Sequence, residues 1–245
     1  MNFLRSSNVV LVLCLTVGML AGCNSGDTVK LLNCRDLSNW QVKPRVDNKT
    51  GKQMGANKWV VGKAKVSAEN PKWLVAEADG CEMINLAKEH RDSWDIYSKE
   101  KFGDCHIELE VMVPKGSNSG IYVMGEYEIQ IFDSFGKDKI VSSDMGAIYG
   151  AAVPPVNASK APGQWQKYVI DFRAPRFDAA GNKIENARFI KVELNGKILH
   201  KDLEMPKQTP AGVTGQERPK GPIMFQGDHG PVAYRNIKIT KLSKE

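Results

Sequence analysis

The 245-residue sequence has few cysteines, no long hydrophobic run and no concentration of positive charge. Its five cysteines include no Cys-x-x-Cys pair and no nearby pair of histidines, so the sequence lacks the spacing of a zinc site. The 34 Lys and Arg residues are scattered among 28 Asp and Glu residues, whereas a nucleic-acid-binding protein carries a basic stripe interleaved with aromatics. We therefore expect no nucleic acid among its partners.

The N-terminal segment has the pattern of a lipoprotein signal peptide. Arg5 precedes an apolar run over residues 9–20, which is shorter than the roughly 20 residues needed to cross a bilayer. The tetrad Leu-Ala-Gly-Cys that ends at Cys23 resembles the bacterial lipobox, in which the cysteine receives lipid such as palmitate and becomes the N-terminus. We predict a signal peptide over 1–22 and a lipidated tether over 23–30, with Cys23 as the lipid attachment site. An ordinary secretory peptide is the alternative.

The lipobox implies a place in the bacterial cell envelope. Asn24 follows the lipidated cysteine, and by resemblance to the enteric sorting rule it favours the outer membrane, on its periplasmic or surface face. Two acyl chains anchor a protein stably without a spanning helix. In that oxidising compartment Cys34, Cys81 and Cys105 remain, and three cysteines allow one disulfide at most. The sequence leaves their pairing open.

The rest of the chain alternates between apolar and polar residues, which is the period of half-buried strands. Strands are expected over 105–111, 127–131, 168–172, 188–194, 197–200 and 232–240, and loops over 114–120, 154–155, 161–163 and 206–222. Asn195-Gly196 between two alternating runs predicts a tight hairpin turn. Residues 88–97 suit either a short helix or an irregular loop. The pattern predicts one all-β domain over 31–245, a sandwich or jelly roll.

Several acidic and amide side chains occupy the polar side of these strands. In a curved two-sheet sandwich one sheet face can be concave and open, so Glu108, Glu110, Glu128 and Gln130 could line a cleft there. A solvated sheet face is the alternative for each of them.

Motifs spread over residues 31–242 resemble the 3-keto-disaccharide hydrolase family, first catalogued as a domain of unknown function. They are LNCRDLSNW from Leu32, NSGIY from Asn118, YEIQIFDS from Tyr127, GAIYG from Gly146, APGQW from Ala161, VELNG from Val192, GPIMFQ from Gly221, DHG from Asp228 and RNI from Arg235. The resemblance implies a concanavalin A-like jelly-roll β-sandwich and cleavage of 3-keto-glycosides. This chain departs from the family pattern at Cys34, at Cys105 and at Gly227, which lengthens the loop before His229.

The chemistry that the resemblance implies makes specific demands on side chains. A keto group at C3 acidifies the hydrogen on C2, so a base can remove it and the C1 substituent can leave by elimination, with or without later hydration. Such a site needs a general base, an acid for the leaving group, and donors or a divalent metal cation to stabilise the enolate. A divalent metal is therefore the one cofactor that this chemistry suggests.

Two residues are the main catalytic candidates. His229 lies in a polar loop flanked by glycines, where no core role requires it, and it could act as base or metal ligand. Glu128 lies on the polar side of a strand whose other side is strongly apolar. The substrate-binding candidates around them are Gln130, Glu126, Asn118, Tyr149, Gln226 and Asp228.

Two other functions suit the same expected fold. Glu128 and Asp133 have a spacing that resembles the catalytic strand of retaining family 16 glucanases, although an odd step of five puts them on opposite faces unless a bulge intervenes. Retaining hydrolysis would need the two carboxyl groups about 5 Å apart. A non-catalytic lectin-like module is the third possibility, because the same scaffold serves binding as readily as hydrolysis.

Overall fold

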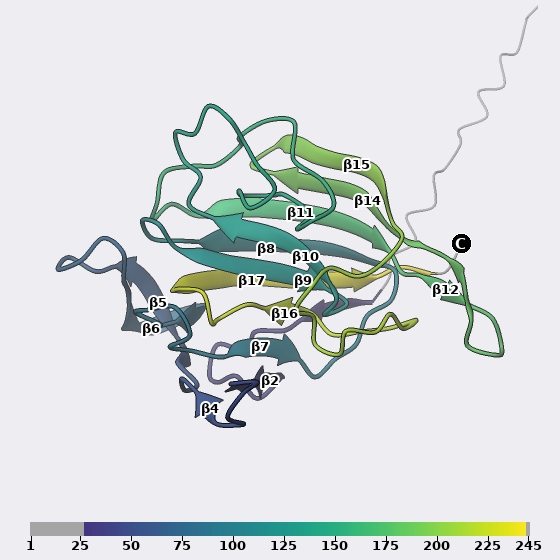
Figure 1. Ribbon diagram of the computed structural model, residues 1–245. Coiled ribbons are helices and arrows are strands. Elements are labelled where there is room, and N and C mark those ends of the chain that lie inside the picture. The colour runs from purple at the N-terminus through teal and green to yellow at the C-terminus, as the bar shows by residue number, and fades with distance from the viewer. Residues whose placement is uncertain (1–26, 244–245) are drawn as a thin grey trace, which may run out of the picture.

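The computed structural model describes residues 27–243, which form two antiparallel β-sheets and two short β-ribbons (Figure 1). The larger sheet has eight strands: β1 (Thr28–Lys30), β5 (Trp59–Val66), β6 (Leu74–Asn85), β8 (Cys105–Met112), β11 (Gln166–Arg173), β14 (Ala187–Leu194), β15 (Lys197–Met205) and β17 (Val232–Lys241). Their order is β15-β14-β11-β8-β17-β6-β5, with β1 beside β17.

The smaller sheet has five strands. They are β2 (Trp40–Lys43), β7 (Asp95–Ser98), β9 (Asn118–Val123), β10 (Tyr127–Phe132) and β16 (Met224–Phe225), in the order β10-β9-β16-β7-β2. The ribbons pair β3 (Arg45–Val46) with β4 (Gln53–Met54) and β12 (Arg176–Phe177) with β13 (Lys183–Glu185). The predicted all-β, concanavalin A-like jelly-roll sandwich is confirmed, and within 27–243 there is no helix.

The hydrophobic core lies between the two sheets. Ile107, Leu109 and Val111 alternate inward from β8, and Ile121 and Ile129 face them from the smaller sheet. All five side chains are at most 1% exposed. Burial of this size is the main source of stability in a sandwich, at about 25 cal/mol per Å² of apolar surface.

The predicted strands are all present, and the open alternative for 88–97 is resolved. Residues 87–94 form a loop, and Asp95 begins β7, so no helix forms there. The expected hairpin turn is also present, since Asn195 and Gly196 both have positive φ, at 51° and 80°. One predicted boundary was wrong. The loop expected over 114–120 ends earlier, because β9 begins at Asn118 and pairs with both β10 and β16.

Part of the N-terminal prediction lies outside the described residues. This holds for the signal peptide over 1–22 and for Cys23, so the lipid anchor stays a prediction. Residues 28–30, assigned above to the tether, form β1 and pair with β17. Among the described residues, no helix is long and apolar enough to span a membrane.

One disulfide joins Cys34 to Cys81, and Cys105 is a buried free thiol. The bridge ties the segment after β1 to the long strand β6. The sequence allowed one disulfide at most, and the structure supplies the pairing.

Candidate active site

The smaller sheet carries a row of polar and aromatic side chains on the face that points away from the core. Residues directly opposite each other in antiparallel strands share a face, so the strand register defines two rows from β10 to β2. The first row is Glu128, Tyr122, Met224, Tyr97 and Gln41. The second row is Gln130, Gly120, Gln226, Asp95 and Lys43.

Glu128 is a buried carboxyl group on this face, with only 4% of its surface exposed. Burial raises its pKa to about 7, against the opposing effects of a hydrogen bond from Tyr122 and the nearby charge of His229. Gly120 makes room for it, because a Cβ at that position would collide with the Glu128 carboxylate. A carboxyl group in this environment is half protonated near neutral pH.

His229 is close enough to Glu128 for the charges of the two side chains to interact, and its ring is oriented by a carboxylate. Nδ1 of His229 is hydrogen-bonded to Asp228, and the other carboxylate oxygen of Asp228 forms an ion pair with Arg45. This bond assigns the proton to Nδ1 and leaves Nε2 as an acceptor. Burial lowers the pKa of His229, and Arg45 lowers it further, while Asp95 and Glu128 oppose the shift. The imidazole is therefore neutral near pH 7.

The loop that carries His229 is held in place by hydrogen bonds between its backbone and two side chains. The Gly227 amide donates to Asp95 at 2.9 Å, and Asn85 Nδ2 donates to the carbonyl oxygens of Gly227 and Gly230 at 2.7 and 2.9 Å. A Cβ at Gly227 would collide with the Trp94 carbonyl. Glycine is therefore the only residue that fits at this extra position of the loop without moving its neighbours.

Four predicted substrate-binding residues lie near Glu128. Gln130 Nε2 donates to Asn118 Oδ1 at 2.6 Å, so the two amides form one polar pair. Gln226 is 7% exposed and lies in the second row. The Tyr149 amide donates to the Glu128 carbonyl at 3.1 Å, and its side chain is 40% exposed. Together with Asp228 these residues surround the Glu128–His229 pair.

Glu126 and Asp133 have other partners. The Glu126 carboxylate accepts hydrogen bonds from the Thr214 amide and hydroxyl and from the Gly215 amide. Asp133 lies beyond the end of β10, and its Oδ2 accepts from the Gly116 amide at 2.8 Å. In the structure both carboxylates therefore hold loops, and their roles in binding or catalysis stay predictions.

Glu108 and Glu110 lie on the other sheet. Glu108 pairs with Lys167 at 3.0 Å, and Glu110 pairs with Arg235 at 2.5 Å, both on the side of β8 that faces away from the core. For these two residues the structure supports the solvated sheet face.

Sequence reasoning missed three residues of the site: Tyr122, Asp95 and Arg45. Tyr122 stands in the quoted Asn118 motif, but only the register between β9 and β10 places it beside Glu128. Asp95 is largely buried, with 14% of its side chain exposed, which raises its pKa, and Arg45 comes from the β3–β4 ribbon. No sequence periodicity connects these elements.

The described residues do not form a ready-made metal site. Within 27–243, no three His, Cys, Asp or Glu side chains gather closely enough to hold an ion together. His229 and Asp228 are engaged with each other and with Arg45 instead.

The fold and the site define a class: a jelly-roll β-sandwich with a buried carboxyl group and a half-buried imidazole on a polar sheet face. Comparison with known proteins makes this specific, because residues 27–240 match the family model of the 3-keto-alpha-glucoside-1,2-lyase-like domain. The chain belongs to this family, and it is a carbohydrate-active domain. No curated protein matches it.

Solved structures with the same fold come from Parabacteroides distasonis. One candidate glycosyl hydrolase is 26% identical, with a TM-score of 0.62 over 88% of this chain and 84% of that one. A second, also named a candidate glycosyl hydrolase, is 16% identical, with a TM-score of 0.55 over 89% of this chain and 94% of that one. The second likeness concerns the fold alone.

Proposed function

We propose that the protein cleaves the glycosidic bond of 3-keto-glycosides by elimination, with His229 as the base and Glu128 as the acid. The observation that carries this proposal is the pair of opposite pKa shifts. The pKa of the Glu128 carboxyl is raised to about 7, and that of the neighbouring His229 imidazole is lowered. Two adjacent groups shifted in opposite directions are the arrangement expected of an acid and a base that work at neutral pH.

The proposed reaction proceeds in balanced steps. Nε2 of His229 takes the C2 proton, and the C2–H electron pair forms the enolate of the 3-keto group. The enolate collapses to a C1=C2 double bond, the C1–O bond breaks, and the departing oxygen takes the proton of Glu128. Water then adds across C1=C2, with hydroxyl to C1 and hydrogen to C2, which returns a free 3-keto sugar.

Two positioning contacts support these roles. Asp228 keeps the His229 ring in the tautomer that can accept a proton, and it stabilises the imidazolium formed after C2 deprotonation. The amide pair of Gln130 and Asn118 beside Glu128 offers neutral hydrogen-bonding groups for sugar hydroxyls. Burial of the site strengthens each of these interactions, because the local dielectric is lower than that of water.

We also propose that the reaction takes place at the bacterial cell envelope, with the protein anchored through the lipid on Cys23. The signal-peptide pattern before Cys23 is the main support. The disulfide between Cys34 and Cys81 agrees with an oxidising compartment. Palmitate labelling of the wild-type precursor and of Cys23→Ser tests this. Equal labelling of both would contradict it.

The acid and base roles can be separated with two substrates of different leaving groups. A 4-nitrophenyl 3-keto-glucoside has a leaving group that departs without protonation, whereas a methyl or disaccharide 3-keto-glucoside needs an acid. We expect Glu128→Gln to retain most activity on the nitrophenyl substrate and to lose about 10²-fold or more on the alkyl one. His229→Ala should lose activity on both.

Glu110→Gln is the matched control, because Glu110 is a partly buried carboxylate on the other sheet, away from the site. It should retain activity on both substrates. Equal losses for Glu128→Gln on the two substrates would refute the acid role of Glu128. Turnover of the parent glycoside, which has no keto group, would support ordinary glycoside hydrolysis instead, and binding without turnover would support a lectin-like module.

A further inference from the structure

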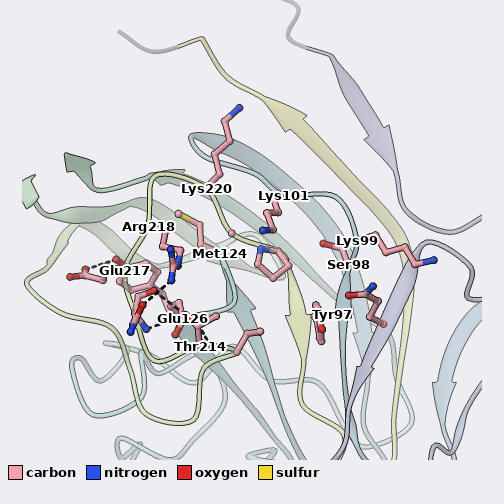
Figure 2. Close-up of a pocket in the computed structure, with 16 residues that line it drawn as sticks. Tyr97, Ser98, Lys99, Lys101, Met124, Glu126, Thr214, Glu217, Arg218 and Lys220 are labelled. Atoms are coloured by element: carbon pink, nitrogen blue, oxygen red, sulfur yellow. Dashed lines mark hydrogen bonds between the residues drawn. The ribbon is translucent and has the colours of Figure 1, made fainter. Parts of the chain in front are cut away.

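A cavity of about 280 Å³ lies at the far side of the same sheet face (Figure 2). Tyr97 and Gln41, the last two members of the first row, are part of its wall. Apolar side chains of Met124, Val213 and Pro222 complete the lining around them. This volume is near the lower end of the roughly 300–1,000 Å³ of ligand pockets, which suits one small ring.

A strap formed by residues 209–215 contacts both Glu128 and the wall of this cavity. At one end the Thr209 hydroxyl accepts a hydrogen bond from the Glu128 amide at 2.9 Å. Further along, Lys43 Nζ of β2 donates to the carbonyl oxygens of Ala211 and Gly212 at 3.0 and 2.9 Å. Val213 and Thr214 then line the cavity. Neither Glu128 nor His229 is among the residues that line the cavity, so the cavity is distinct from the Glu128–His229 site.

The two acidic residues that line the cavity are already satisfied. Glu126 accepts three hydrogen bonds from the strap. Glu217 accepts from the Tyr127 hydroxyl at 2.5 Å and pairs with Lys183 at 2.6 Å. The charge of Glu217 is thus compensated by Lys183, whereas Glu126 is stabilised by neutral donors and keeps its negative charge.

Four basic side chains surround the opening: Lys99, Lys101, Arg218 and Lys220. Among the described residues none of the four has a carboxylate within ion-pair distance; Arg218 donates only to the Gln216 amide oxygen, at 2.8 Å. In Figure 2, Lys99 and Lys220 extend outward, whereas Lys101 and Arg218 point toward the other lining residues. The four cations exceed the single negative charge of Glu126, so the opening has a net positive charge.

We propose that this cavity binds an anionic sugar, a single ring that bears a carboxylate or a phosphate. The ring would pack on Tyr97 and the apolar lining, as sugars pack on aromatic faces, with Gln41 and Gln216 facing its hydroxyls. The anionic group would reach Lys101 and Arg218, whose guanidinium fork matches carboxylate and phosphate oxygens. The site is separate from the proposed reaction and does not depend on it.

Isothermal titration of the full mature protein with four probes tests the proposal: glucuronate, glucose 6-phosphate, glucose and inorganic phosphate. We expect the two anionic sugars to bind and glucose to bind at least about tenfold more weakly, since glucose lacks the charge-assisted hydrogen bonds to Lys101 and Arg218. Binding of inorganic phosphate as tight as that of glucose 6-phosphate would contradict a sugar site and indicate a simple anion site. Affinity for the anionic sugars should fall as salt is raised to about 0.3 M, because these cations are exposed and screened.

Paired variants locate the site. The double variant Lys101→Met/Arg218→Met should weaken glucuronate binding at least about tenfold. The control double variant Lys197→Met/Lys201→Met, on the exposed side of β15, should leave glucuronate binding unchanged. His229→Ala should bind the anionic sugars as wild type does, even if the proposed reaction is wrong. Binding that survives the cavity variants, or that disappears in His229→Ala, would overturn the proposal.

Discussion

Removal of the Glu128 carboxyl group should stabilise the protein at alkaline pH. The pKa of Glu128 rises from 4.5 to about 7 on folding, so the folded state binds more protons than the unfolded state between these values. Its contribution to stability is therefore fully present below pH 4.5 and is lost as the pH rises through 7. A shift of this size corresponds to about 3 kcal/mol.

Urea unfolding of wild type and Glu128→Gln at pH 5 and pH 8 measures this contribution. We expect the free energy of unfolding of Glu128→Gln, relative to wild type, to rise by up to about 3 kcal/mol between the two pH values. The control Glu110→Gln should show no such rise, because the pKa of Glu110 is lowered in the folded state, with Arg235 and Asn236 as its hydrogen-bond partners. A difference between wild type and Glu128→Gln that does not change with pH would refute the environment assigned to Glu128.

Three further changes have defined outcomes. Gly227→Ala should lower both stability, by about 1–3 kcal/mol, and activity, because its Cβ would collide with the Trp94 carbonyl in the loop that positions His229; urea unfolding and rate assays check this. Cys34→Ser removes a disulfide with a sequence separation of 47 and should cost about 4 kcal/mol by loop entropy, and reduction of wild type should match it. Arg45→Met removes a charge that lowers the pKa of His229, so the acid limb of the kcat/KM profile should move to higher pH. An acid limb at the wild-type position would contradict the Arg45 contact.

The fold could be predicted from the sequence because period-two alternation is a local signal. Strands such as β8, β10 and β14 have one face in the core, and their patterns are unambiguous. The beginning of β9 was missed because Ser119 and Gly120 are small residues typical of turns. Pairing with β10 and β16 on both sides outweighs their low strand propensity.

The site could be predicted only in part. Glu128 and His229 became candidates through local patterns, the first as a polar residue of an alternating strand and the second as a histidine in a glycine-flanked loop. That they share one environment depends on cross-strand register, and Arg45 arrives from a ribbon about 80 residues before Glu128 in the chain. Burial, which raises the pKa of Glu128, is a tertiary property that the sequence does not contain.

The most direct test of the proposed function follows the hydrogen at C2. A 3-keto-glucoside labelled with deuterium at C2 is incubated with wild type, with His229→Ala and without enzyme, and the label in the sugar product is measured by mass spectrometry. Elimination predicts that wild type releases the aglycone and that the product has lost its C2 deuterium, with a primary isotope effect on the rate. Aglycone release with the C2 deuterium fully retained would contradict the mechanism.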